Sequence, residues 1–118
     1  MKTSELTGLA FNWAVAIALG WKWKAGNSTI ILARPNKNSK RKFTELGLNH
    51  FHPTSCWSIA GPIIEREGIT LRCGLHGWDA ELPEFGVLTD GKSALEAAMR
   101  CFIASKLGDE IELPKELL

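Results

Sequence analysis

The segment from Ser93 to Pro114 constrains the fold of this chain most strongly, because it has the pattern of one amphipathic helix with a defined start and end. Ser93 is placed to cap the free amides of the first turn, and Glu96 completes a capping box three residues later. Gly108 can take the left-handed conformation just past the helix end. Apolar side chains recur at helical spacing on one face: Leu95, Met99, Phe102 and Leu107.

A second helix is predicted near the start of the chain, from about Ser4 to Leu19, with Gly20 placed to end it. Its apolar residues fall on one stripe at helical spacing: Leu6, Leu9, Ala10, Trp13, Ala14 and Ile17. Thr3 or Ser4 is placed to cap it.

Between the two helices, alternating or β-branched segments predict strands at residues 21–24, 29–33, 69–73 and 78–82. The first two are separated by turn residues and predict a hairpin. Other segments predict a basic loop at 34–42, an ordered loop at 53–62, and a helical turn or short strand at 63–67. The whole pattern predicts an α+β fold, an antiparallel sheet with the N- and C-terminal helices packed on it.

The chain has 118 residues, 45% of them hydrophobic and 23% charged, which suits a single domain spanning residues 1–118. No window approaches the roughly 18 apolar residues of a membrane span, so we expect no membrane partner. The three cysteines, Cys56, Cys73 and Cys101, are odd in number and widely spaced. They predict free thiols in a reducing, cytoplasmic compartment rather than a disulfide framework.

Charge is unevenly spread although the net charge is only +1. Residues 1–60 hold eight Lys or Arg and two Glu, and residues 61–118 hold six Lys or Arg and eleven Asp or Glu. Opposite charges of this kind attract within one chain or between two copies, so a homo-oligomer is one partner to consider.

Three patches of the sequence resemble the NinX family of small bacteriophage proteins. They are residues 3–16, which contain Thr-Ser-Glu-Leu-Thr-Gly and Trp-Ala-Val-Ala; residues 61–69, Gly-Pro-Ile-Ile-Glu-Arg-Glu-Gly-Ile; and residues 97–110. Trp57, shortly before the second patch, is also shared with the family. The family has no established biochemical activity to carry over. The resemblance implies an accessory role during infection, in the cytoplasm of the bacterial host.

The patch around Gly61 and Pro62 is the first candidate site. Glu65 and Arg66 project charge just after the Gly-Pro pair, and Trp57 could supply an aromatic wall, as recognition of a planar, nucleotide-like ligand requires. Trp78 could add a second wall. The alternative interpretation places Trp57 in the core, with the charged residues solvated or paired.

A second set contains possible metal ligands: His50, His52, Cys56, Cys73 and His76. Cys73 and His76 have a usable local spacing for zinc, but the set lacks the tight pairing of standard structural sites. Surface histidines and buried free cysteines explain it more simply, so we predict neither a metal nor a cofactor.

A basic run, Lys37, Lys40, Arg41 and Lys42, is the only feature that suggests nucleic acid. The net charge is near zero and the run lacks interleaved aromatic residues, so we expect only weak, non-specific association with nucleic acid. A solvated loop is the simpler interpretation.

No P-loop, GxGxxG, HExxH or nucleophile-elbow motif occurs in the sequence. We therefore predict a non-enzymatic accessory protein of a bacteriophage or related mobile element that binds a host, phage or defence protein. Capture of a small ligand is the main alternative, and nucleic-acid binding is the third.

Overall fold

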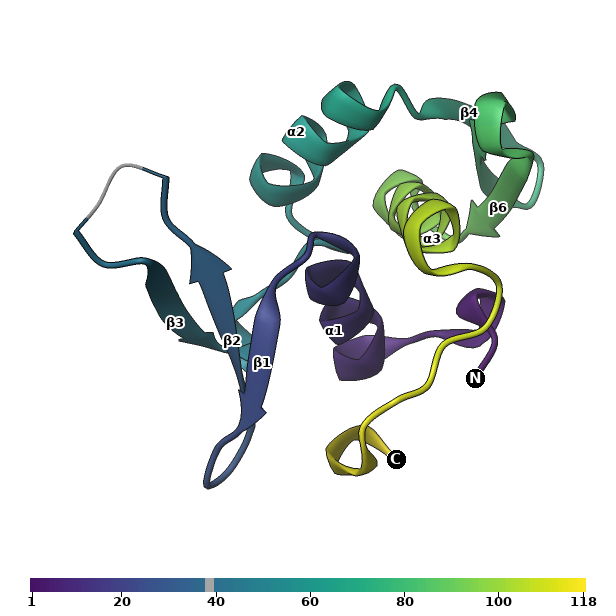
Figure 1. Cartoon of the computed structure of the whole chain (residues 1–118). Helices are drawn as coiled ribbons and strands as arrows, with labels where there is room; N and C mark the ends of the chain where they lie inside the picture. The colour runs from purple at the N-terminus through teal and green to yellow at the C-terminus, as the bar shows by residue number, and fades with distance from the viewer. Residues whose placement is uncertain (38–39) are drawn as a thin grey trace.

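The computed structural model describes residues 1–37 and 40–118; Asn38 and Ser39, inside the predicted loop 34–42, lie outside the described residues. The described residues form two three-stranded antiparallel sheets and three α-helices (Figure 1). The first sheet has the order β1 (Lys22–Ala25), β2 (Ile30–Pro35), β3 (Phe43–Gly47). The second has the order β4 (Thr70–Gly74), β5 (Gly77–Leu82), β6 (Val87–Gly91). The helices are α1 (Gly8–Ala18), α2 (Trp57–Glu67) and α3 (Ala94–Leu107). The predicted α+β class is confirmed, with the strands divided between two sheets.

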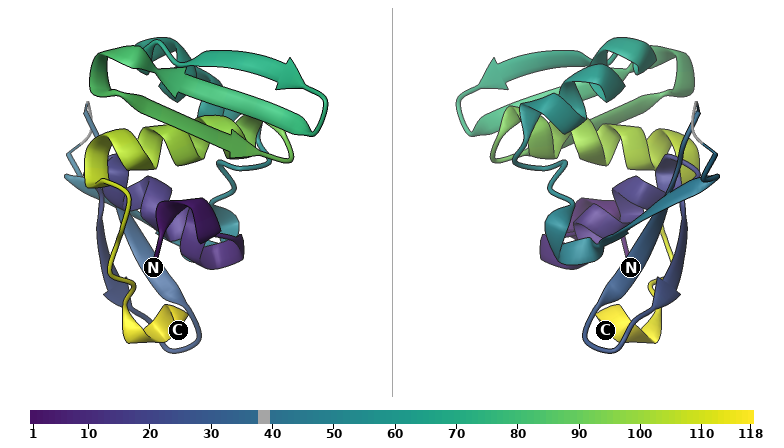
Figure 2. Two further views of the ribbon diagram at one scale, coloured as in Figure 1. Left: turned by 90° about the vertical axis from the view of Figure 1, so that its right-hand side faces the viewer. Right: turned by 90° about the vertical axis from the view of Figure 1, so that its left-hand side faces the viewer.

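Helix α3 lies at the centre of the molecule. It covers one face of the second sheet, and α1 and α2 pack beside it (Figures 1 and 2). Its predicted cap is present, since the Ser93 hydroxyl accepts a hydrogen bond from the Glu96 amide at 3.1 Å. The Glu96 carboxylate accepts from the Lys92 amide at 3.2 Å, so the reciprocal bond of the capping box is shifted by one residue. Gly108 follows the helix with φ +90°.

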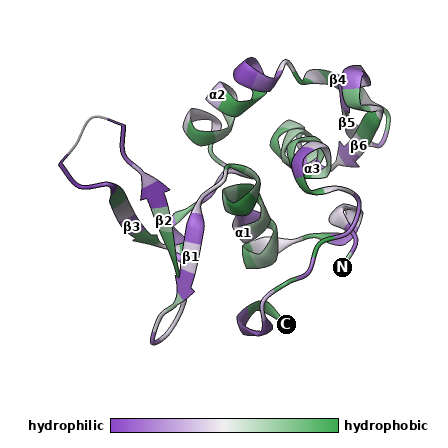
Figure 3. Cartoon of the chain, in the orientation of Figure 1, coloured by the Kyte–Doolittle hydropathy of each residue, from purple (hydrophilic) through white to green (hydrophobic). Residues whose placement is uncertain are grey.

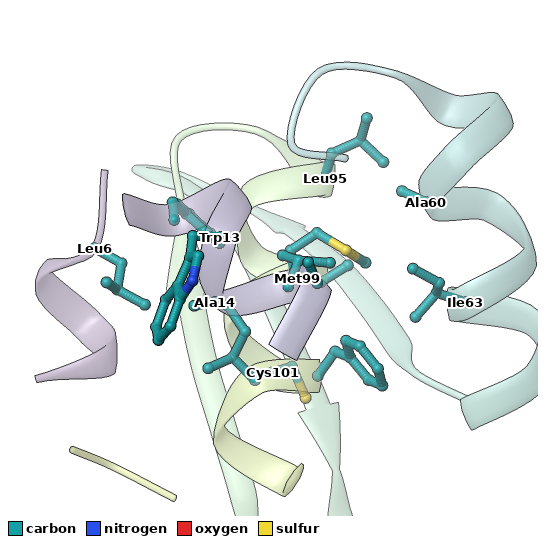
Figure 4. Packing of buried hydrophobic residues seen from close by; sticks show 14 of the residues in the cluster. Leu6, Trp13, Ala14, Ala60, Ile63, Leu95, Met99 and Cys101 are labelled. Carbon is teal, nitrogen blue, oxygen red and sulfur yellow. The ribbon is translucent and has the colours of Figure 1, made fainter. Parts of the chain in front are cut away.

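The packing of α3 on the sheet is close enough to require small residues. A Cβ on Gly91 of β6 would come within 2.5 Å of the Ala97 amide nitrogen. Two buried residues of α3, Leu95 and Met99, lie on the side of α2 in Figure 4, where Ala60 and Ile63 of α2 point toward them. Phe102 is fully buried, as its place in the predicted stripe requires.

Helix α1 is shorter than predicted. It begins at Gly8, while Thr3–Glu5 form a separate 3₁₀ turn (η1). Leu9 was expected on the buried stripe but is exposed. The reason is that α1 packs against α3 and also borders the first sheet, where the Trp13 and Trp23 rings meet edge to face at 6.1 Å. The helix therefore buries every residue from Phe11 to Ala16 rather than one stripe.

The sequence predicted a loop at 53–62 followed by one helical turn or a short strand, and this prediction is wrong because the structure has a helix, α2, in this region. It is continuous from Trp57 to Glu67 although it contains Gly61 and Pro62. Apolar side chains along one side hold it against the core: Ile59, Ala60, Ile63 and Ile64. Proline within a helix removes one backbone hydrogen bond, and burial of this side outweighs that loss.

Two strands also went unpredicted. Residues 43–47 form β3, followed by a 3₁₀ turn, η2 (Leu48–His50). Residues 87–91 form β6, which follows η3 (Pro83–Phe85). Both are edge strands with few buried side chains, so their sequences lack a clear alternation.

The first three residues are tied to the segment that follows α3. The Thr3 amide donates to the Asp109 carbonyl at 2.8 Å, and the Ile111 amide donates to the Met1 carbonyl at 2.9 Å. The chain then ends in a last 3₁₀ turn, η4 (Lys115–Leu117). Among the described residues, no helix has the length and apolar content needed to cross a bilayer.

Candidate functional site

The outward side of α2 gathers three of the four residues predicted to bind a ligand. Residues four apart lie in rows along a helix, which gives one row of Trp57, Gly61 and Glu65 and a second of Ser58, Pro62 and Arg66. We call these six residues the α2 outer face. Trp57 is 58% exposed, so its indole is available at the beginning of the helix.

The inward side of α2 is held to α3 by packing and by an ion pair. The Glu67 carboxylate contacts Lys106 Nζ of α3 at 3.0 Å, and its second oxygen accepts from Arg66 Nε at 3.0 Å. The hydrogen bond from Lys106, with a further one from Arg66, lowers the pKa of Glu67 below its usual range. The Arg66 guanidinium is thereby placed at the end of the outer face.

Gly61 has no evident role inside the folded chain. It lies in a helix interior, where glycine costs roughly 1 kcal/mol relative to alanine. A Cβ built on it would meet nothing within 4 Å among the described residues. Pro62 also has no N–H to donate to the Ser58 carbonyl. Departures from local helix rules are expected at functional sites. Gly61 leaves a flat surface beside the exposed Trp57.

The fourth predicted residue, Trp78, lies elsewhere. It is on β5 and lines a cleft of about 520 Å³ between the start of α1, the β4–β5 turn and the β6–α3 connection. Trp57, Glu65 and Arg66 do not line this cleft. Trp57 and Arg66 are themselves separated by about 13 Å along the helix axis. The structure therefore places the predicted residues in two places, three on α2 and one in the cleft.

Arg100 is the residue of this cleft that sequence reasoning missed. It is only 9% exposed, and its two terminal nitrogens donate to the carbonyls of Asp90 and Leu6, both at 3.0 Å. The guanidinium lies 4.9 Å from the centre of the Phe11 ring. An arginine directly after the buried Met99, on the core side of a helix, was the available signal. Arg100 gives the cleft a fixed guanidinium, beside Lys92 and three carboxylates that also line it, Asp79, Asp90 and Glu96.

The possible metal ligands do not form a site. The part of the chain that the structure describes contains no group of three or more His, Cys, Asp or Glu side chains that could hold a metal. Cys56 instead occupies the N-cap position of α2, where its sulfur lies 3.0 Å from the Ser58 hydroxyl. That hydrogen bond lowers the pKa of the Cys56 thiol. Burial raises the pKa of Cys101 to about 11.

Fold and surface together define a small α+β protein with an exposed helix face on α2 and a separate cleft at Arg100. The family model of bacteriophage P22 NinX matches residues 2–106. The chain belongs to the NinX family, as its three patches of resemblance predict, and it is an accessory protein of bacteriophage. No curated protein matches the chain.

Proposed function

We propose that this protein is non-enzymatic and acts in the cytoplasm of the infected bacterium by binding a host or defence protein through the α2 outer face. The exposed Trp57 beside Gly61 is the observation that supports this proposal most strongly. Tryptophan is enriched among the residues that dominate protein–protein affinity, usually where it enters a desolvated pocket. A glycine next to it lets the partner's main chain come close.

The other end of the face suggests how the partner is oriented. Glu65 and Arg66 are exposed and carry opposite charges, and Arg66 is held by Glu67. Complementary charges at the edge of an interface mainly set orientation and association rate. The partner surface should therefore combine an apolar pocket for Trp57 with a cationic group for Glu65 about 12 Å further along the helix axis, and Arg66, half a turn around the helix from Trp57, marks the far edge of the contact.

Quantitative affinity capture from infected cells tests this function. The wild-type chain is compared with Trp57→Ala, and Leu88→Ala serves as the control because Leu88 is 64% exposed on the second sheet. We expect one host protein to be enriched by the wild type and by Leu88→Ala, and lost at least tenfold with Trp57→Ala. Equal recovery with Trp57→Ala contradicts the proposal.

A small ligand in the Arg100 cleft is the second candidate function. The volume of about 520 Å³ lies in the range of ligand sites, and Trp78 and Arg100 supply an aromatic surface and a positive charge. A ligand at a hundred times its Kd stabilises a protein by about 2.7 kcal/mol. A panel of nucleotides in a thermal melting assay tests it, with Trp78→Ala as the variant that abolishes the shift. If no nucleotide raises Tm, this function is excluded.

A further inference from the structure

The basic residues of the chain are concentrated on one sheet. Residues 20–56, which contain the first sheet and its connections, hold seven Lys or Arg and one acidic residue, Glu45. Hydrophilic residues accordingly mark β1, the end of β2 and the β2–β3 connection in Figure 3. The acidic residues of the second half belong to other elements, although Glu116 lines a hollow together with residues 26–30 at the β1–β2 connection. Although the net charge of the whole chain is near zero, residues 20–56 carry a local charge of +6.

The first sheet has one buried and one open face. Trp23, Leu32 and Leu46 lie opposite each other across the strands and face the core. The alternate positions face away from α1: Lys22 and Lys24 on β1, Ala33 on β2, and Phe43 and Glu45 on β3. In the described part of the chain no helix covers this open face (Figures 1 and 2).

An aromatic ring stands among these charges. Phe43 is 41% exposed, and Lys22 Nζ lies 5.8 Å from the centre of its ring. Ala33 lies between Lys22 and Glu45 in the cross-strand row, so the middle of the face is shallow. Lys24 is partly neutralised by Glu45 at 3.2 Å, whereas Lys22 lies over the Phe43 ring.

The connection to β3 is held by hydrogen bonds at the same end of the sheet. The Asn36 amide donates to the Lys42 carbonyl at 2.9 Å, and the Asn36 side chain donates to the Thr44 hydroxyl at 2.7 Å. These bonds close the base of the connection and fix the start of β3. Successive side chains of a strand alternate between its two faces, so Phe43 lies on the open face and the neighbouring Lys42 does not.

We propose that this cationic sheet face, Lys22, Lys24, Ala33 and Phe43, binds single-stranded nucleic acid. The lysines meet backbone phosphates, and an unpaired base stacks on Phe43 over the shallow centre at Ala33. A single strand is favoured over a duplex because paired bases cannot stack on a flat surface ring. In the sequence the basic run has no interleaved aromatic residue, whereas in the structure Phe43 of the first sheet provides an aromatic ring. This inference goes beyond the proposed function and uses none of the α2 outer face.

Fluorescence anisotropy of the full-length protein with a labelled 20-nucleotide oligothymidine and with a 20-base-pair duplex, at several salt concentrations, tests the proposal. We expect tighter binding of the single strand, with a log–log salt slope of about −1.4 for two phosphate contacts. Phe43→Leu should weaken binding about tenfold at unchanged slope. Lys22→Gln should reduce the slope by about 0.7.

Matched controls use residues outside the first sheet. Phe85→Leu and Lys115→Gln change an exposed ring and an exposed lysine outside the first sheet and should leave affinity unchanged. Thermal melting checks that Phe43→Leu folds normally. Equal or tighter duplex binding, insensitivity to Phe43→Leu, or equal competition by polyglutamate would each overturn the proposal. Absence of nucleic-acid binding would not change the result expected from affinity capture with Trp57→Ala. The nucleic-acid proposal and the protein-partner proposal can therefore be rejected independently.

Discussion

Arg100 shows how one side chain joins distant parts of this chain. It connects α3 to the Leu6 carbonyl, 94 residues away in sequence, and to Asp90 of β6. Arg100→Met should lower the free energy of unfolding by about 2–4 kcal/mol, because a buried carbonyl, that of Leu6, and a part-buried one, that of Asp90, lose charged donors. Urea denaturation measures this, with the exposed Arg66→Met as the control, expected to cost under about 1 kcal/mol. A similar small loss for Arg100→Met would mean that the bridge is not structural.

Two of the thiols, Cys56 and Cys101, should differ in reactivity with pH. The hydrogen bond from Ser58 lowers the pKa of Cys56, so its thiolate forms at lower pH than that of a free peptide cysteine, whose pKa is about 8.5. Cys101 is buried, and its pKa is raised to about 11. Alkylation followed by mass spectrometry from pH 6 to pH 9 should label Cys56 early and leave Cys101 unlabelled until denaturant is added. Equal labelling of Cys56 and Cys101 in the folded protein contradicts this.

Burial of single residues was predictable where one helix face decides it. Phe102 and Trp13 are buried as expected. Arg100 was not predictable, because burying its charge depends on carbonyls supplied by other elements. Leu9 was predicted wrongly, because its exposure depends on where α1 begins.

At the scale of elements, the ion pair between α2 and α3 makes stability depend on pH. Glu67 has a lowered pKa in the folded state, so its contribution is present above the ordinary glutamate value of about 4.3 and is lost as pH falls through the folded-state pKa. Glu67→Gln should cost about 1 kcal/mol at pH 7 and progressively less below about pH 4.

Denaturant titrations at several pH values measure this difference, and Glu65→Gln on the exposed side of α2 is the matched control. A cost that stays constant down to pH 2 would exclude the charge as its source.

Elements with clear caps were predictable and those without were not. Ser93 and Gly108 mark α3 at both ends, and the structure confirms them. Because of Gly61 and Pro62, a loop was predicted where α2 forms. Helix formation there depends on packing against α3, which the local sequence does not show. The candidate site was affected in the same way. Trp57, Glu65 and Arg66 were identified, but only a continuous helix shows that all three lie on its exposed half, with Trp57 and Arg66 half a turn apart around the axis.

At the scale of the whole molecule, a single hydrophobic cluster runs from Leu6 to Leu113 and includes residues of both sheets. We predict that the chain unfolds as one domain. Leu32→Ala in the first sheet and Phe102→Ala in α3 should lower stability by roughly 2–5 and 3–5 kcal/mol, each shifting one common transition. Circular dichroism and tryptophan fluorescence should give coincident curves. A second transition, or a stable proteolytic fragment ending near residue 60, contradicts a single domain.

The sequence pattern did not predict that the strands divide into two sheets. Each hairpin is local, but whether two hairpins join depends on what lies between them, and here α3 and α1 fill that space (Figure 2). The separation matters for function, because it leaves a basic sheet, an acidic sheet and the α2 outer face as distinct surfaces.

Site-specific photocrosslinking in infected cells tests most directly whether the α2 outer face is the contact with a partner. A photoreactive amino acid replaces Ser58, which lies beside Trp57, or Leu88 as the matched exposed position on the second sheet. The account predicts one crosslinked protein at position 58, lost when Trp57→Ala is added, and none at position 88. A crosslink at position 88 with none at position 58 would contradict it.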